Sequence, residues 1–214
     1  MITRTLTRRV ALATAAVTSA LVLAACGGDS DDNGDGGTGH TGHGASAASA
    51  TPSASAGAHN AQDVAFAKGM IPHHQQALQM AELAADRASS AKVKDLAARI
   101  EKAQDPEIRT LTGWLKAWGE QPPAAGMDHS GHTGMSGMSG MMSEDDMAAL
   151  KKATGKDFDT RFLSLMVEHH QGAVEMAATE KQRGRSAEAK AMADAIITAQ
   201  DAEIKEMKRL LGAE

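Results

Sequence analysis

Two pairs of adjacent histidines, each flanked by methionines, are the residues of this sequence best suited to bind a metal. The first pair lies in MIPHHQQALQMA, residues 70–81, and the second in MVEHHQGAVEMA, residues 166–177. Imidazole nitrogen binds copper, zinc, nickel and iron, whereas thioether sulfur selects copper, chiefly Cu(I). The His-x-x-x-His and Glu-x-x-His spacings of zinc and di-iron helices do not occur around these histidines. The residue types therefore favour copper.

These residues could instead be ordinary core residues. A stripe of methionines at helical spacing fills a core readily, because the thioether is flexible and packs in many shapes. A buried neutral imidazole brings one donor and one acceptor, and both need partners. A metal would satisfy the acceptor nitrogens directly, so the sequence leaves both interpretations open. Hydrogen-bond partners could also come from Gln104, Glu107, Gln200 and Glu203.

A second group of histidines and methionines lies in the segment MDHSGHTGMSGMSGMM, residues 127–142. This segment is too polar and too rich in glycine to form a core, so its side chains could surround an ion. The alternative is a low-complexity linker, and His40 and His43 of an earlier glycine-rich stretch are weaker candidates still. The candidate ligands of the segment are Met127, His129, His132, Met135, Met138, Met141 and Met142.

Amphipathic helices are the elements that must position the histidine pairs. At about 100° per residue, the histidines and methionines of residues 70–81 fall within an arc of roughly 120°, so they share one face. Phe66, one turn earlier, marks that face as the inward one. Gly155 and Gly184 are expected as C-terminal stops. The predicted helices cover residues 61–87, 90–118, 144–154, 158–183 and 187–211.

The chain contains an internal duplication at a constant offset of 96 residues. The histidine pairs match each other, and AQDPEI (103–108) matches AQDAEI (199–204) in the helix that follows each pair. Two copies of a helix hairpin give four long helices, and no alternating β-branched run predicts a sheet. We therefore expect an all-α four-helix bundle with pseudo-twofold symmetry and a short extra helix in the central connection.

The two copies differ at two prolines. Pro72 stands where the second copy has Glu168, and Pro106 stands where it has Ala202. Because a proline inside a helix removes a hydrogen bond and favours a kink, we expect the two halves to differ in geometry.

The N-terminal segment predicts export and a lipid anchor. Three arginines precede a short apolar run over residues 10–25, which is typical of a secretory signal peptide. The run ends at LAAC, which resembles the lipobox of bacterial lipoproteins and implies cleavage before Cys26 and lipidation of its thiol. The alternative is an unpaired thiol at the end of the signal. A flexible tether then follows to residue 60.

The net charge of the chain argues against nucleic acid as its partner. Loss of the three signal arginines takes the formal net charge from −5 to −8, and no basic stripe is present, so nucleic acid is not an expected partner.

The sequence predicts three parts of the chain: a signal peptide (1–25), a lipidated tether (26–60) and a helical domain (61–214). That domain contains the halves 61–118 and 156–211 and the Met/His-rich loop 119–143.

The duplicated motif resembles the DUF305 family, bacterial envelope proteins with a ferritin-like four-helix bundle, some of which bind copper. The resemblance rests on FAKGMIPHHQQALQMA with downstream AQDPEI, and on FLSLMVEHHQGAVEMA with downstream AQDAEI and Met207. It covers nearly all of residues 61–118 and 156–211. The candidate metal ligands that it implies are Met70, His73, His74, Met80, Met166, His169, His170 and Met176.

These observations predict a copper-binding lipoprotein on the extracytoplasmic face of the cell membrane. Its expected role is sequestration, buffering or delivery of Cu(I) or Cu(II), in exchange with a copper-handling envelope protein. No catalytic constellation stands out, so we do not expect an enzyme. The main alternative is a metal-free envelope module whose helical bundle recognises a protein partner. A copper-dependent oxidase or reductase is a third alternative.

Overall fold

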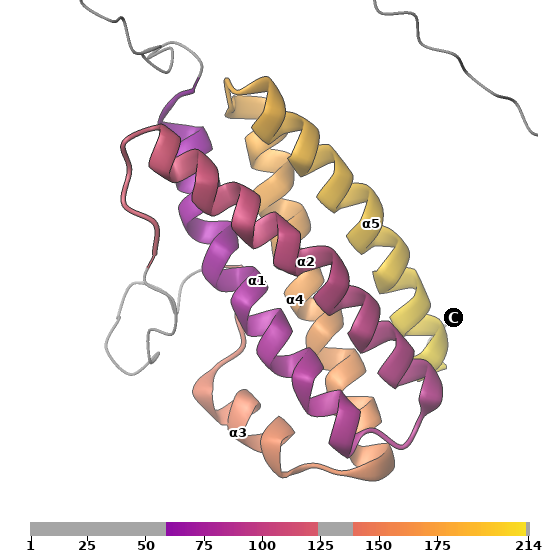
Figure 1. Cartoon of the computed structure of the whole chain (residues 1–214). Coiled ribbons are helices and arrows are strands. Elements are labelled where there is room, and N and C mark those ends of the chain that lie inside the picture. The colour runs from indigo at the N-terminus through magenta and orange to yellow at the C-terminus, as the bar shows by residue number, and fades with distance from the viewer. Residues whose placement is uncertain (1–58, 124–138, 213–214) are drawn as a thin grey trace, which may run out of the picture. The chain divides into compact units, whose positions relative to one another are not determined.

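The structure, a computed structural model, describes residues 59–123 and 139–212. Within these two ranges it contains five helices and no strand: α1 (Ala61–Arg87), α2 (Ala91–Ala117), α3 (Glu144–Lys152), α4 (Gly155–Arg183) and α5 (Ala187–Leu211). This confirms the all-α class and the short helix in the central connection. α1 packs against α2 and α4 against α5, so each copy of the duplicated sequence forms one hairpin (Figure 1).

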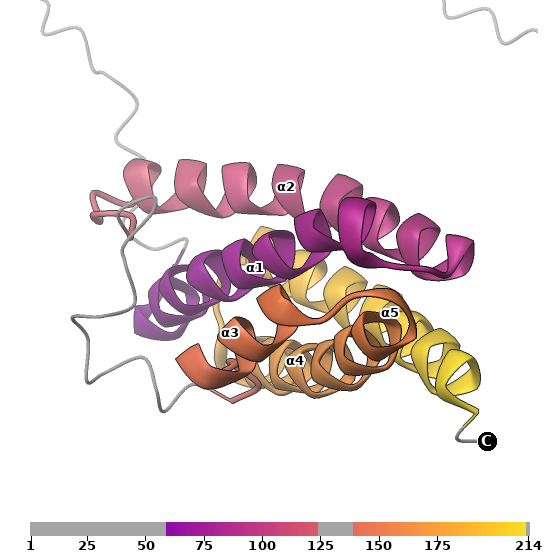
Figure 2. The ribbon, with the colours of Figure 1, turned by 90° about the horizontal axis from the view of Figure 1, so that it is seen from below.

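The two hairpins meet mainly through α1 and α4, which run in opposite directions (Figure 1). α3 lies across these two helices, as Figure 2 shows from below. Pro72 and Pro106 lie inside α1 and α2, and both helices continue through them. Because α1 and α4 pack against each other, the helices that carry the histidine pairs lie side by side. Assignment of this arrangement to the ferritin-like class stays a prediction.

The helix boundaries agree with the predicted ones except at the junction of α3 and α4. α3 ends at Lys152 and α4 begins at Gly155, so the prediction of Gly155 as a C-terminal stop was wrong. Ala153 and Thr154 adopt extended backbone between the helices. Gly155 then takes a φ of +63°, which glycine adopts more readily than other residues. The chain thus turns within two residues, and α4 starts before the predicted Phe158.

The apolar core is divided into two clusters. One lies between the C-terminal half of α1 and the N-terminal half of α4, and it contains Met80, Phe162 and Met166. The other lies between the opposite halves and contains Phe66 and Met70. Because α1 and α4 are antiparallel, the middle of each helix falls between the two clusters. Both histidine pairs occupy this middle layer.

Two equivalent aspartates each hold the loop of the opposite hairpin. Asp159 of α4 accepts hydrogen bonds from the amide of Ser89 (3.1 Å), its hydroxyl (2.5 Å) and the amide of Ser90 (3.0 Å). Asp63 of α1 accepts a hydrogen bond from the amide of Ser186 (2.8 Å). Each carboxylate thus lies at the N-terminus of the second helix of the other copy, where the helix dipole favours negative charge.

No helix in the described ranges is long and apolar enough to cross a membrane. The predicted signal peptide (1–25), Cys26, and the tether to residue 58 with His40 and His43 lie outside those ranges. Residues 124–138 of the Met/His-rich loop lie outside them as well.

Replacement of Asp159 by alanine should lower the free energy of unfolding by about 1.5–3 kcal/mol, because an ionised carboxylate that accepts several hydrogen bonds is lost. Asp63→Ala should have an effect of similar size. The control is Asp157→Ala, whose carboxylate is 64% exposed and pairs with Arg161 one turn away; we expect a change below about 0.5 kcal/mol. Urea denaturation followed by circular dichroism measures all three, and equal effects of Asp157 and Asp159 would contradict the capping role.

Candidate metal site

The four histidines of the two copies form one row across the interface of α1 and α4. The rings of His73 and His169 are in contact, with centroids 3.7 Å apart and planes at 39°. Within each helix, the two adjacent ring centroids are 6.4 Å apart. His73, His74, His169 and His170 are each at most 1% exposed. We refer to these four residues as the histidine layer.

The outer histidines of the layer are each bonded to a glutamate of their own hairpin. His74 Nε2 lies 2.7 Å from Glu107 Oε2, and His170 Nε2 lies 2.7 Å from Glu203 Oε2. A carboxylate only accepts hydrogen bonds, so each Nε2 carries a hydrogen. In the neutral ring the lone pair is then on Nδ1, which has no hydrogen-bond partner in either residue. A carboxylate behind an imidazole is the usual arrangement that orients a metal-binding histidine.

The inner histidines, His73 and His169, have no hydrogen-bond partner at either ring nitrogen. Burial, and then the nearby rings of His74 and His170, lower the pKa of His73 to about 3. Burial and the neighbouring histidines also hold the pKa of His169 well below its usual range. Both rings are therefore neutral at pH 7, and each carries a nitrogen lone pair.

Six of the eight ring nitrogens in the layer thus lack a hydrogen-bond partner. Two of the expected partners are in place, the carboxylates of Glu107 and Glu203. The other two, Gln104 and Gln200, lie in the core with their own side-chain oxygens unpaired. Buried polar atoms are normally paired, and unpaired ones signal strain or a site for water or an ion. Unpaired imidazole lone pairs fit a soft or borderline metal ion.

The predicted methionine ligands lie on both sides of the histidine layer. Met80 and Met166 belong to one apolar cluster and Met70 to the other, and all three are fully buried. Met176 is only half-buried, although it is the equivalent of Met80. The difference follows from α3, whose Met147 joins the cluster that contains Met80, so that α3 adds cover at this end.

The described part of the chain contains no group of three or more His, Cys, Asp or Glu side chains arranged to hold a metal ion. The row geometry explains this, because His74 and His170 reach toward the second helix of their own hairpins while His73 and His169 face each other. The central donors are therefore one pair of imidazoles, with methionines in the apolar clusters on either side of the histidine layer.

The structure places only the last two loop candidates, Met141 and Met142, because Met127, His129, His132, Met135 and Met138 lie outside the described residues. Met142 packs against the apolar cluster that contains Met80. Its main chain is hydrogen bonded to the side chain of Gln76 in α1. The end of the loop is thus fastened close to the histidine layer.

Sequence reasoning missed two residues that fasten this loop, Gln76 and Gly172. They occupy equivalent positions of the duplication, each three residues after the first histidine of its pair. The sequence marks these positions only as a difference between the two copies, because one copy has a long amide side chain where the other has none. Nothing in the sequence tells which segment they contact.

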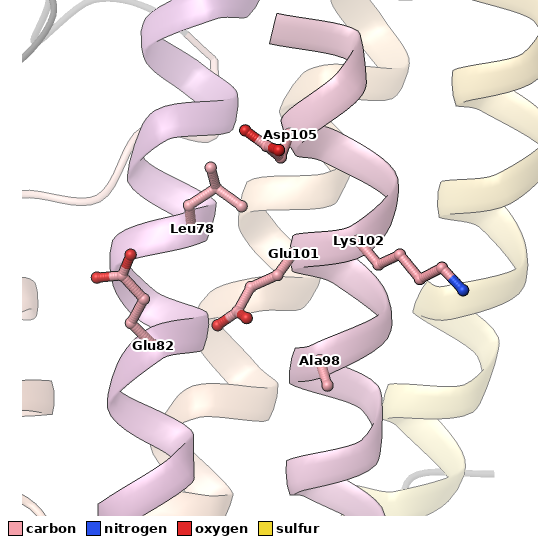
Figure 3. Close-up of a pocket in the computed structure, with 6 residues that line it drawn as sticks. All are labelled: Leu78, Glu82, Ala98, Glu101, Lys102 and Asp105. Carbon is pink, nitrogen blue, oxygen red and sulfur yellow. The ribbon is translucent and has the colours of Figure 1, made fainter.

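An open groove of about 400 Å³ lies between α1 and α2, away from the histidines. The side chain of Glu101 extends toward Glu82, whereas Lys102 points toward α5 (Figure 3). Burial, and then the charge of Glu82, raise the pKa of Glu101. No histidine or methionine is among the groove's lining residues, which are Leu78, Glu82, Ala98, Glu101, Lys102 and Asp105.

The chain matches the family described as Domain of unknown function (DUF305) over residues 63–211, a range that includes both hairpins and all four histidines. It belongs to the DUF305 family, which confirms the resemblance predicted from the duplicated motif. A comparison with curated proteins finds no significant match.

Several solved structures resemble this one. A DUF305 protein of Streptomyces coelicolor is 32% identical, over 71% of this chain and 91% of its own, with a TM-score of 0.63. CopM in its Cu(II)-bound form is 37% identical, over 70% of this chain and 95% of its own, with a TM-score of 0.60. CopM in its Cu(I)-bound form is 36% identical, over 69% and 94%, with a TM-score of 0.56.

A second buried acid–base feature lies near one end of α4. Glu180 is fully buried beside Asp63, and burial, followed by the Asp63 carboxylate, raises the pKa of Glu180 to about 8. Gln62 and Lys190 act in the opposite direction. Burial opposes ionisation of Asp63 as well, but its hydrogen bonds lower its pKa. At pH 7, Glu180 is therefore protonated and Asp63 ionised.

The free energy of unfolding should therefore fall as pH rises from about 4.5 to about 8, because the folded protein keeps a proton on Glu180 that the unfolded chain releases. Glu180→Gln removes this dependence and should be more stable than the parent at pH 8 by about 2–4 kcal/mol, with no difference near pH 4.5. The contribution of Asp63 is lost only below its ordinary pKa, outside this window. Urea denaturation at each pH tests the prediction, with the exposed Glu168→Gln as control; parallel curves for E180Q and the parent would refute it.

Proposed function

We propose that this protein is an extracytoplasmic lipoprotein that binds copper and serves in its sequestration, buffering or delivery. The observation that carries the proposal is the histidine layer, with six buried imidazole nitrogens that lack a hydrogen-bond partner. Leaving such atoms unpaired costs free energy, and in neutral rings four of these nitrogens carry a lone pair, so a metal ion that accepts these lone pairs would stabilise the fold. Copper-bound structures of CopM, about a third identical to this chain, support copper as that ligand.

The proposed mechanism is ligand exchange among weak donors. His73 and His169 supply neutral imidazoles at the centre, and the flanking thioethers add soft donors that favour Cu(I). A site made of a few neutral donors can release its ion to another protein as well as capture it. The full ligand set proposed is Met70, His73, His74, Met80, Met166, His169, His170 and Met176, with the Met/His-rich loop as an additional binding segment.

Cellular placement is a proposal that rests on the sequence. The apolar N-terminal run and Cys26 directly after Ala24 and Ala25 support export and lipid anchoring. We further propose that the hairpin arrangement belongs to the ferritin-like class, and that copper is bound and handed on without catalysis. The partner would be another copper-handling protein of the envelope.

A metal-free module that binds a protein partner is the alternative function. The hydrogen bonds of Glu107 and Glu203 to the outer histidines favour it, since they form part of a buried polar network. The unpaired inner histidines count against it, because a network that is only partly satisfied destabilises a core.

Replacing both His73 and His169 by leucine should separate metal binding from folding. The double variant should bind Cu(I) at least tenfold more weakly, because the central imidazole pair is lost. Its metal-free form should be as stable as the parent or more stable by about 1–3 kcal/mol, because leucine is similar in volume and has no nitrogen to leave unpaired. Isothermal titration with Cu(I) and with Cu(II), and urea denaturation, measure the two quantities.

The control for this pair is His59→Leu, because His59 stacks on Trp118 outside the layer and should leave copper binding unchanged. Unchanged uptake by the double variant would move the site to the loop. If the parent chain took up no copper at all, the partner-binding module would be favoured. A marked loss of metal-free stability in the double variant would indicate a structural polar network instead.

The methionines are tested by replacing Met70 and Met166 with leucine, which conserves volume and should change stability by less than about 1.5 kcal/mol. Affinity for Cu(I) should fall more than affinity for Cu(II), because a thioether is a soft ligand. Met147→Leu, in α3 and buried in one of the same clusters, is the matched control. Competition titration against a coloured Cu(I) chelator measures the effect, and equal affinities in all variants would show that these methionines are core residues only.

A further inference from the structure

The last residues of the methionine-rich connection, Ser139–Met142, are fastened to both helices that carry the histidines. On α1, Gln76 is 2% exposed and bonds the main chain of Met142 twice. The Met142 amide donates to Gln76 Oε1 (2.8 Å), and Gln76 Nε2 donates to the Met142 carbonyl (3.0 Å). An amide side chain that bonds the N–H and the C=O of one residue fixes both its position and its direction.

On α4 the same segment is held by close packing of backbone on backbone. A Cβ atom on Gly172 would lie 2.1 Å from the carbonyl oxygen of Ser139, and one on Gly140 would lie 2.8 Å from the carbonyl oxygen of His169. Both positions therefore require glycine. The Ser139 hydroxyl also donates a hydrogen bond to Glu175 of α4.

These contacts place the segment directly beside the inner histidines. Gly140 contacts the main chain of His169, and Met142 is bonded to Gln76, which lies three residues after His73 in α1. Gln76 and Gly172 are equivalent positions of the duplication. The first hairpin thus holds the segment through the side chain of Gln76, and the second provides Gly172, which has no side chain and lets the segment pack against its main chain.

Several parts of the structure cover the histidine layer, and this segment is the part that can move with the least disruption of other contacts. All four histidines are at most 1% exposed, so an ion reaches them only if some cover moves. Separating α1 from α2, or α4 from α5, would break the His–Glu bonds and open the apolar clusters. Lifting Ser139–Met142 breaks the Gln76 and Glu175 contacts, and Met142 is the one side chain of the segment that packs against an apolar cluster.

We propose that Ser139–Met142 is the gate through which a soft metal ion enters and leaves the histidine layer, and that Gln76 and Gly172 are positioning residues that hold it closed. This inference rests on the proposed function and adds to it the entry route and the residues that set the exchange rate. Met141 and Met142 both belong to this segment, so the gate itself contains two thioethers.

The test compares Gln76→Ala and Gly172→Ala with two matched controls in the full mature chain. Gln79→Ala removes an exposed amide from the same helix, and Gly113→Ala adds a methyl group that meets no atom within 4 Å. The first measurement uses metal-free protein: the rate at which diethyl pyrocarbonate modifies histidines 73, 74, 169 and 170, resolved by peptide mapping. The second is the rate of Cu(I) uptake from a coloured chelator complex.

Both rates should rise in Gln76→Ala, roughly tenfold for the loss of two hydrogen bonds, and at least as much in Gly172→Ala, whose new Cβ displaces the segment. The controls should match the parent. Amide exchange should accelerate at Met142 but not in the middle of α2 and α5, which distinguishes gate opening from global unfolding.

Unchanged histidine modification in both variants would overturn the gate, whether or not copper binds. Faster modification that is matched by equally faster exchange throughout α2 and α5 would overturn it too, since unfolding would then explain the access. If modification accelerates locally while the parent binds no copper in the layer, the proposed function fails and the gate stands as the route of access to the histidines.

Discussion

The burial of four imidazoles where two antiparallel helices meet is the constraint on which the rest of this structure depends. This layer divides the apolar core into two clusters, because an apolar cluster cannot continue through a layer of ring nitrogens. It also fixes where the second helix of each hairpin lies, since Glu107 and Glu203 must reach the outer rings. The inner rings have no such partner, and they contact each other instead. Apolar side chains at these positions would leave no polar atom unpaired, and this cost of the layer is the basis of the metal-binding role that we propose.

The symmetric contacts of the structure come from the internal duplication, and the asymmetric contacts come from positions at which the two copies differ. Asp63 and Asp159 cap opposite hairpins in the same way, and the two His–Glu bonds have the same length. Gln76 and Gly172 break the symmetry, because a single connecting segment cannot contact both copies identically. Glu180, which has Ala84 as its equivalent, breaks it again by adding a buried acid to one end only.

The chemistry of the layer depends on keeping its central donors neutral. Burial lowers the pKa values of His73 and His169, so both rings are neutral at pH 7 and each has one nitrogen with a lone pair. The carboxylates that hold the outer rings assign their hydrogens to Nε2 and leave Nδ1 unpaired. Neutral nitrogen and thioether donors suit the soft metal ion that we propose as the ligand.

Much of this protein could be derived from its sequence alone. Helical periodicity and the 96-residue offset determined the helix hairpins, and the shared face of residues 70–81 determined that the histidines point inward. These are local properties, set by the angle between successive side chains. Pairing across the two copies was decided only by tertiary packing: that His73 meets His169, that Asp159 caps Ser89, and that Gln76 holds Met142. Such contacts join residues far apart in the chain, and periodicity within one helix carries no information about which atoms of another segment come to lie against it.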